Sequence, residues 1–475
     1  MRQNEATHDE RAMAQAVRDA YARGEEDEVL EPLALFGQDG NPIGRIQDGD
    51  YVIFYDIRGE REIELTRSFV DPDFREFPVD EGLKARFVTM IQYDESLHAM
   101  VAFPPLREID HTLSQVISDH GLRQAKITES EKAIHLQYFL NGKVDEPFGG
   151  EERVIVPSPR VDDYTLVPQM NVAGVTGAVL EKNADPSCDV TFANFVNVDV
   201  VGHIENQEAI KKAVETVDFH IGKVVDAARK AGVITMVTAD HGTVEKWLYP
   251  DGAIDTGHTD SAVPFSLISS HQLTLRDGGA LTDVAPTVLD LLGLPRPEVM
   301  TGSSLLQEAP LGGIEKRRVL LLIVDGWGYR EETHGNLIAQ ANTPVMDSLE
   351  REYPFTTLSA SGKAVGMPEG TVGNSEAGHL HLGAGRRIPS DRLRIDGALE
   401  DGSFYENEAF LWAMRGAKRA RTRLHLLGIV SFYSSHGSLD HLLALLELAR
   451  REEVEEVYIH SMLGRRGEHP ESGAR

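Results

Sequence analysis

The chain has 475 residues, a length that suits two domains of ordinary size. Hydrophobic residues make up 41% and charged residues 26%, so the composition predicts a folded protein with a large core and excludes a disordered chain. Asp and Glu outnumber Lys and Arg by 76 to 47, which gives a formal net charge of −29. So acidic a protein is expected to bind neither nucleic acid nor anionic membranes, and an anionic substrate would need a local basic pocket.

Cysteine content and the absence of targeting segments point to a reducing compartment. Cys188 is the only cysteine, which excludes an intramolecular disulfide and a cysteine-based zinc site. The polar N-terminus lacks the apolar core of a signal peptide, and the longest apolar runs, such as residues 319–324, are too short to span a bilayer. We therefore expect a soluble, cytoplasmic protein.

Apolar runs that end in polar turns predict strands buried on both faces of a parallel sheet. In chain order these strands are predicted at residues 51–55, 190–195, 233–238, 319–324, 424–430 and 454–459. Apolar residues at helical spacing predict helices at residues 206–231, 283–292 and 440–451. The alternation of strands and helices indicates an α/β protein. Residues 301–316, rich in Gly, Ser and Pro, are typical of a linker.

Polar residues follow several predicted strands at their carboxyl ends, where open parallel sheets place their active sites. Asp199, Asp240, His241 and Asp325 each come shortly after such a strand, and His203 lies four residues beyond Asp199. Each short motif alone is common in ordinary turns. Their recurrence at strand ends across the chain is what favours a functional site.

Two further segments extend this group of candidate ligands. His258 lies between Gly257 and Thr259, and Ser375 lies in the glycine-flanked segment 373–379. Carboxylate and imidazole ligands without thiolate suit Mn²⁺ or Zn²⁺, and paired metal ions can clamp the oxygens of a phosphoryl group. A serine hydroxyl becomes a nucleophile when a metal lowers its pKa. The pattern therefore predicts metal-dependent phosphoryl chemistry at Ser375.

Basic residues are candidates for holding an anionic substrate. Arg58 and Arg61 lie three residues apart after the first predicted strand, and arginine pairs bind carboxylates or phosphates with two parallel hydrogen bonds. Lys132, Arg466 and His436 lie in other polar segments. On spacing alone, a solvated charged turn or a surface residue explains each of them as well as a binding role does.

At these residues the sequence resembles the cofactor-independent (2,3-bisphosphoglycerate-independent) phosphoglycerate mutases of the alkaline phosphatase superfamily. The matching motifs lie at residues 128–132, 155–159, 199–203, 238–242, 275–279, 324–328 and 373–379, and the similarity covers nearly the whole chain. Family members begin with the segment that here starts near Arg318 and end with the segment that finishes near Leu306. The resemblance therefore implies a circular permutation, with the usual ends fused through a linker at about residues 307–316.

The resemblance also implies the architecture. It predicts an alkaline-phosphatase-like, mostly parallel sheet flanked by helices, together with a second α/β substrate (transferase) domain. The phosphatase-like, metal-binding domain is expected to run without a break over residues 105–388. The substrate domain would combine residues 1–104 with residues 389–475.

The family's site residues carry over onto matching positions of this chain. The resemblance implies two divalent metal ions, with Mn²⁺ as the first choice and Zn²⁺ or Mg²⁺ as alternatives. One ion would be held by Asp199, His203 and His258, and the other by Asp325, Ser375, Asp240 and His241. Ser375 would accept the phosphoryl group, and Lys132 would neutralise it in the transition state. The organic acid would be oriented by His436, Arg466, Arg58 and Arg61.

The chain also departs from the family pattern. Gly467 stands where the family has an acid/base aspartate, residues 432–434 replace an aspartate-glycine-glycine run, and Thr243 replaces an asparagine. A family segment that carries two further substrate arginines is missing. The groups expected to recognise glycerate are thus reduced, whereas all seven metal-site residues are present.

We therefore expect a monomeric, glycolytic isomerase that interconverts 3-phosphoglycerate and 2-phosphoglycerate through a phosphoserine intermediate. Its partner would be a small anionic phosphorylated acid. Two alternatives stay open. One is a phosphatase or a mutase for another phosphorylated or phosphonate-bearing small acid, and the other is an inactive binding or regulatory paralogue.

Overall fold

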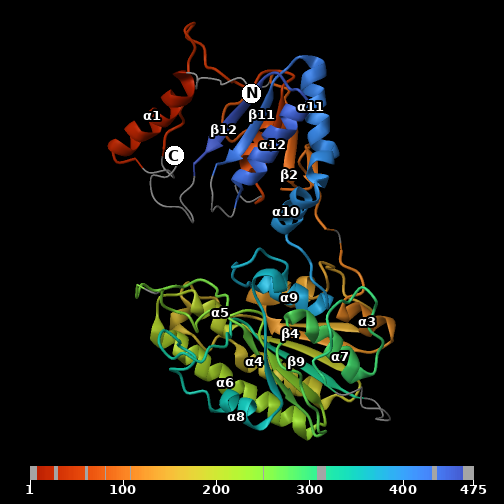
Figure 1. Ribbon diagram of the computed structural model, residues 1–475. Helices are drawn as coiled ribbons and strands as arrows, with labels where there is room; N and C mark the ends of the chain where they lie inside the picture. Colours follow the sequence, from red (N-terminus) through yellow and green to blue (C-terminus); the bar gives the residue numbers. More distant parts are fainter. Residues whose placement is uncertain are drawn as a thin grey trace. The chain divides into compact units, whose positions relative to one another are not determined.

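The computed structural model describes residues 8–25, 30–58, 62–80, 82–106, 108–249, 251–307, 317–430 and 436–463. The chain divides into two compact units (Figure 1): unit 1 comprises Met1–Pro105 and Asp391–Arg475, and unit 2 comprises Leu106–Ser390. These boundaries lie one or two residues from the expected domain limits. The linker expected at residues 307–316 lies outside the described residues except for Gln307. Residues 301–306, which the composition also assigned to a linker, instead pack in unit 2: Leu305 is fully buried and its carbonyl accepts the N–H of Arg276 at 2.9 Å.

Unit 2 is built on a seven-stranded sheet with the strand order β10-β8-β7-β9-β6-β4-β5. Its strands are β4 (Gln124–Glu129), β5 (Glu151–Val156), β6 (Val190–Phe195), β7 (Ile234–Thr238), β8 (Val263–Ile268), β9 (Val319–Val324) and β10 (Phe355–Leu358). Neighbouring strands from β7 to β5 pair in parallel, whereas β8 is antiparallel to both β7 and β10. The carboxyl ends of β6, β7 and β9 therefore share one edge of the sheet.

Helices cover both faces of this sheet (Figure 1). They are α3 (Leu113–Asp119), α4 (Val172–Ala184), α5 (Asn197–Gly202), α6 (Gln207–Lys230), α7 (Val284–Leu292), α8 (Pro344–Glu352) and α9 (Ser375–Ala384). Helix α6 packs against α4 and α8, whereas α9 packs against α3 and α7. Short helical turns span Ser130–Lys132, His135–Phe139, Tyr164–Leu166, Leu281–Asp283 and Gly362–Val365.

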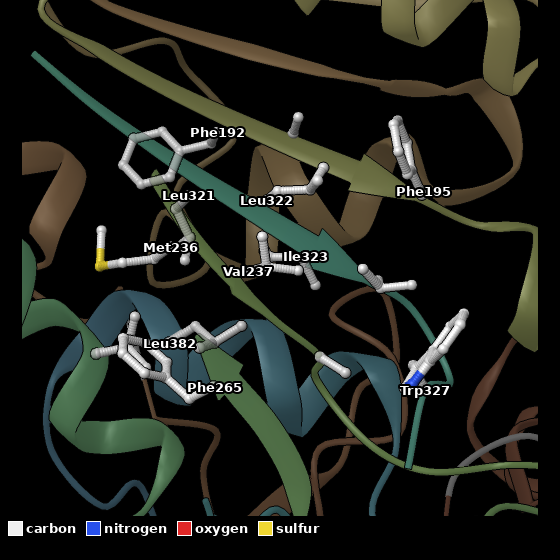
Figure 2. Packing of buried hydrophobic residues seen from close by; sticks show 14 of the residues in the cluster. Phe192, Phe195, Met236, Val237, Phe265, Leu321, Leu322, Ile323, Trp327 and Leu382 are labelled. Carbon is white, nitrogen blue, oxygen red and sulfur yellow. The ribbon is translucent and has the colours of Figure 1, made fainter. Parts of the chain in front are cut away.

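Strand β9 is the centre of the core of unit 2. All six of its residues are apolar and at most 1% exposed, because β6 and β7 flank it and other elements cover both faces. Figure 2 shows Leu321, Leu322 and Ile323 of this strand among Phe192 of β6 and Met236 of β7. Burial of each such side chain contributes about 1.5–3 kcal/mol to the stability of the fold, so the strand that precedes Asp325 is firmly held.

Unit 1 contains a smaller, wholly parallel sheet with the order β12-β11-β1-β2-β3. Its strands are β1 (Tyr51–Phe54), β2 (Arg86–Ile91), β3 (Met100–Phe103), β11 (Leu424–Ile429) and β12 (Val457–Met462). Its helices are α1 (His8–Ala22), α2 (Glu62–Val70), α10 (Asp391–Asp401), α11 (Glu408–Ala420) and α12 (Leu439–Arg451), and a helical turn spans Ser403–Glu406. Helix α11 packs on β1, β2 and β3. Across the described residues, no helix combines the length and the apolar character needed to cross a membrane.

The last strand begins three residues later than predicted. The chain is still leaving α12 at Glu453, which has a φ of 55°, and the N–H of Val454 donates to the carbonyl of Ala449. Strand β12 starts only at Val457, which pairs with Leu424 of β11. The apolar residue at position 454 therefore closes a helix end and does not open a strand.

A buried histidine ties α9 to the segment that follows it. The N–H of Ile388 donates to Nε2 of His381 at 3.0 Å, so the ring proton must lie on Nδ1, which donates to the carbonyl of Ala377 at 2.7 Å. The bond accepted by Nε2 requires a neutral ring. Burial lowers the pKa of His381 from 6.5 to about 4.

Acid should weaken unit 2 through this residue. Between the two pKa values the unfolded chain binds a proton that the folded chain does not, so this contribution to stability is lost as the pH falls from 6.5 toward 4. From pH 7 to pH 5 the loss should be about 2 kcal/mol. Urea unfolding of metal-free protein at both pH values checks this. A His381→Gln variant, which keeps a donor and an acceptor without titrating, should show a smaller loss, and equal acid sensitivity would contradict the expectation.

Candidate metal centre

Three neighbouring strands deliver the central carboxylates. Asp325 directly follows β9, Asp240 and His241 follow β7, and Asp199 lies in α5 just beyond β6. The N–H of Asp325 donates to the carbonyl of Phe195 at 3.0 Å, and the N–H of Asp199 donates to the carbonyl of Asp325 at 3.2 Å. The turns that leave β6 and β9 are thus hydrogen-bonded to each other, which explains why residues far apart in sequence meet at one edge of the sheet.

Ser375 is the first residue of α9, and its position depends on close backbone contacts. Asn374 caps the helix, since its side-chain oxygen accepts the N–H of Ala377 at 2.8 Å. A Cβ atom on Gly378 would lie 2.5 Å from the carbonyl oxygen of Asp240, so only glycine lets the helix approach the turn after β7. The serine hydroxyl and the positive end of the helix therefore face the carboxylates.

The seven predicted metal-site residues lie together. Ligand atoms converge in two groups, one of Asp199, His241 and His258 and one of Asp240, His241 and Asp325. Nε2 of His203 lies 3.3 Å from Oδ1 of Asp199 and 3.2 Å from Nε2 of His258. The Ser375 hydroxyl donates to Oδ1 of Asp325 at 3.2 Å and lies 2.9 Å from Nε2 of His241.

Lys132 reaches into the same cluster. Its Nζ lies 2.6 Å from Oδ2 of Asp199 and 3.3 Å from Oδ1 of Asp325, and it donates to Oγ of Ser375 at 2.5 Å. Burial disfavours the ammonium, but the carboxylates of Asp325, Asp199 and Asp240 outweigh that effect and raise the pKa of Lys132 above its ordinary value. The lysine therefore stays charged beside the serine hydroxyl.

The charges of the cluster fit divalent cations. Asp199, Asp240 and Asp325 are at most 2% exposed, and although burial opposes ionisation, the histidines and Lys132 hold the pKa of each carboxyl below its usual value. Three buried negative charges thus face the Lys132 ammonium and the imidazoles of His203, His241 and His258. Carboxylate and imidazole donors without thiolate are the ligands that Mn²⁺ and Zn²⁺ accept in proteins.

Several residues that support the ligands were not found from the sequence. Nδ2 of Asn194 donates to Oδ2 of Asp325 at 2.9 Å, and the hydroxyl of Thr243 donates to Oδ1 of Asp199 at 3.3 Å. Nδ1 of His379 lies 3.1 Å from Oδ2 of Asp240. Asn194 carried a usable signal, because an amide inside a mostly apolar, fully buried strand needs a buried partner.

The remaining predicted substrate residues belong to unit 1. Nδ1 of His436 lies 2.9 Å from Oε1 of Glu62, and the N–H of Ile57 donates to the carbonyl of His436 at 2.5 Å. The segment with His436 therefore lies beside the end of β1, where half-buried Arg58 follows. Arg61 and Arg466 lie outside the described residues, as do Phe432–Ser434 and Gly467.

The fold and the site together define an α/β protein in which two groups of candidate metal ligands lie beside a buried serine. The chain belongs to the Metalloenzyme superfamily, whose family model matches residues 33–296 and 317–460. This match confirms the expected alkaline-phosphatase-like α/β fold class and supports the binding of divalent metal.

Curated relatives confirm the resemblance noted in the sequence. The 2,3-bisphosphoglycerate-independent phosphoglycerate mutase 2 of Methanosarcina acetivorans is 42% identical over 292 residues, which cover 61% of this chain and 56% of that protein. The 2,3-bisphosphoglycerate-independent phosphoglycerate mutase of Moorella thermoacetica is 43% identical over 302 residues, which cover 63% and 58%. The chain thus spans little more than half the length of these relatives. A crystal structure of Leishmania mexicana phosphoglycerate mutase aligns with a TM-score of 0.42 and 30% identity, over 57% of this chain and 53% of that one.

Metal binding should release a proton from His241. Burial disfavours the charged ring, but the carboxylates led by Asp240 outweigh burial and raise the pKa of His241 to about 10 in the metal-free protein. A ligand imidazole must be neutral, so Mn²⁺ affinity should rise with pH between 7 and 9, and binding at pH 8 should release about one proton from this residue.

Calorimetric titration of Mn²⁺ in two buffers of different ionisation enthalpy measures the released protons. The variant His241→Gln removes the titrating ring and should release about one proton fewer. An affinity that is the same at pH 7 and pH 8.5 would contradict the expectation.

Proposed function

We propose that this chain is a metal-dependent phosphotransferase that interconverts 3-phosphoglycerate and 2-phosphoglycerate, an isomerase that works through a phosphoserine at Ser375. The observation that carries the proposal is the position of Oγ of Ser375. It lies at the start of α9, 2.5 Å from Nζ of Lys132 and 2.9 Å from Nε2 of His241, among three buried carboxylates. Relatives named as phosphoglycerate mutases, 42–43% identical, favour this substrate over other phosphorylated small acids.

The donor set suits two divalent cations, with Mn²⁺ as the first choice and Zn²⁺ or Mg²⁺ as alternatives. We assign Asp199, His203 and His258 to one ion, and Asp325, Ser375, Asp240 and His241 to the other. When bound, such ions lower the pKa of a ligand hydroxyl and stabilise charge on phosphoryl oxygens.

The protein's own groups then carry the transfer. Oγ of Ser375 bonds to phosphorus while the bond from phosphorus to the substrate oxygen breaks, and the proton lost by Oγ ends on that departing oxygen. The second transfer reverses these changes at the neighbouring hydroxyl, which returns Ser375 to its free form. Throughout, the Lys132 ammonium offsets charge on the phosphoryl oxygens, and the N–H groups at the start of α9 favour a phosphate there.

The two units divide the work in this proposal. Unit 2 is the phosphatase-like, metal-binding domain, and unit 1 is the substrate (transferase) domain, in which His436, Arg58, Arg61 and Arg466 orient the organic acid. We also infer that the chain is a circular permutant of these mutases. In support, the family model matches two segments that flank residues 297–316, and each curated match covers only about 300 residues, as a collinear alignment to a permuted chain would.

Phosphorus NMR tests the proposal directly. Mn²⁺-loaded protein given 3-phosphoglycerate should produce the resonance of 2-phosphoglycerate, and Ser375→Ala should reduce the rate by at least about a thousandfold because the nucleophile is gone. A phosphoserine at position 375, trapped by acid quench and located by mass spectrometry, would establish the intermediate.

The alternatives predict other results in the same experiment. Free phosphate without 2-phosphoglycerate, lost in Ser375→Ala, would indicate a phosphatase or a different acceptor. No turnover by protein that holds its metal would exclude 3-phosphoglycerate and direct the search to other phosphorylated or phosphonate-bearing acids. An inactive paralogue would keep its function in Asp325→Ala, whereas the enzyme should lose both metal and activity.

A further inference from the structure

Glu245 is a fully buried glutamate that belongs to neither group of candidate metal ligands. It lies four residues after His241, and the proposed transfer does not use it. A buried carboxylate is costly unless hydrogen bonds satisfy it, so its partners indicate what it does.

The carboxylate bridges two loops that carry metal-site residues. Oε2 of Glu245 accepts the N–H of Thr243 at 3.0 Å, in the turn that contains His241. Oε1 accepts the hydroxyl of Thr259, the residue next to His258. One side chain therefore links the turn after β7 to the loop that supplies His258.

Thr259 extends this link to the catalytic serine. Its N–H donates to the carbonyl of Gly242 at 3.0 Å, and its carbonyl accepts the N–H of Gly373 at 3.0 Å. Gly373 lies in the turn that leads into Ser375. The threonine that Glu245 holds is thus hydrogen-bonded through its own backbone to both neighbouring loops.

A fourth segment packs directly on the glutamate. A Cβ atom on Gly328, three residues after Asp325, would lie 2.1 Å from Cδ of Glu245, and one on Gly242 would lie 2.5 Å from its Oε1. A side chain at either position would have to displace this carboxylate, and one at Gly242 would also displace the Thr259 hydroxyl. Glu245 fills the space between the backbone after β9 and the backbone after β7.

We propose that Glu245 is a positioning residue for the metal centre: its carboxylate sets the relative placement of the loops that bear His241, His258, Ser375 and Asp325. The inference rests on the proposed metal binding at those residues. Metal ligands must be placed within a few tenths of an ångström, and here they come from separate loops. Without this shared anchor, the bound metal alone must order the loops, and the affinity of the protein for the metal falls.

The variant Glu245→Gln tests this with little change in volume. Both partners of the carboxylate donate hydrogen bonds, and the amide offers only one acceptor oxygen, so one of the two links is weakened. The matched control is Glu151→Gln, because the Glu151 side chain is equally buried in unit 2 but contacts Lys126, Arg153 and Asn141, away from the ligand loops. The readouts are Mn²⁺ affinity by calorimetry and urea unfolding of the metal-free proteins.

Both glutamine variants should unfold at lower urea. Only Glu245→Gln should also bind Mn²⁺ about tenfold or more weakly. Wild-type Mn²⁺ affinity in folded Glu245→Gln would overturn the proposal, and so would an equal loss of affinity in Glu151→Gln.

Gly328→Ala displaces the carboxylate without altering its charge and should reproduce the loss of affinity. Gly177→Ala, in α4 with open space for the added carbon, should leave affinity unchanged. If Glu245→Gln does not fold, the variants Thr259→Val and Thr259→Ser test the same hydrogen bond, since only the serine keeps the hydroxyl that Glu245 accepts. The valine variant should lose Mn²⁺ affinity and the serine variant should recover it, and equal affinities would overturn the proposal.

These measurements use Mn²⁺ alone, so they separate the inference from the proposed function. Protein whose Mn²⁺ affinity depends on Glu245 but which produces no 2-phosphoglycerate would refute the mutase activity and leave the positioning role intact. Wild-type protein that binds no divalent metal would overturn both.

Discussion

The structure of unit 2 depends on one electrostatic constraint: three carboxylates held almost out of water at adjoining strand ends. Asp199, Asp240 and Asp325 would repel one another strongly in a buried site unless positive groups lay among them. Lys132 and His241 supply part of that compensation and divalent cations fit the remainder, which is why the site selects cations in a protein with a net charge of −29. In the proposed function, the same positive charge offsets the negative charge of a phosphorylated acid at this point.

The order of the strands in the sheet brings these charges together and holds them in place. Strand β9 is flanked by β6 and β7 in parallel, so three carboxyl ends meet, and the apolar residues before Asp325 anchor that turn in the core (Figure 2). Helix α9 then adds Ser375 at its positive end, with Gly378 allowing contact with the turn that holds Asp240. Hydrogen bonds from Asn194 and Thr243 orient individual oxygens, whereas Glu245 connects the loops. Some contacts therefore orient single ligand atoms, and others fix whole loops relative to one another.

The sequence predicted those parts of the fold in which local pattern and tertiary environment agree. The run at residues 319–324 is continuously apolar, and the run at residues 190–195 is apolar except for Thr191 and Asn194, because both are buried on both faces; β6 and β9 have these bounds. The pattern says less about β4, which buries Lys126 against Glu151 and Asn141, and about β5, an edge strand that is partly exposed. Asp240, His241 and Asp325 could be placed at the edge of the sheet because they follow apolar runs, whereas the full set of ligands was assigned from the family resemblance. Glu245 could not be predicted, since its role arises from contacts with segments that only the fold brings near it.

The distribution of functional groups also indicates how this architecture can change substrate. Unit 2 contains Ser375, Lys132 and every candidate metal ligand, so all that phosphoryl transfer to the serine requires lies within one compact core. The differences from the mutase pattern lie mostly elsewhere, at Phe432–Ser434 and Gly467 of unit 1. In the proposed function, substitutions there would alter recognition of the organic acid without disturbing the buried charges, whose mutual compensation leaves little freedom for change. Thr243 is the exception, and its hydroxyl donates to Asp199, so this substitution keeps a hydrogen-bonding group at the site. The proposed phosphoryl chemistry thus depends on a tightly coupled charge cluster in one unit, whereas the proposed recognition of the organic acid depends on separable contacts in the other.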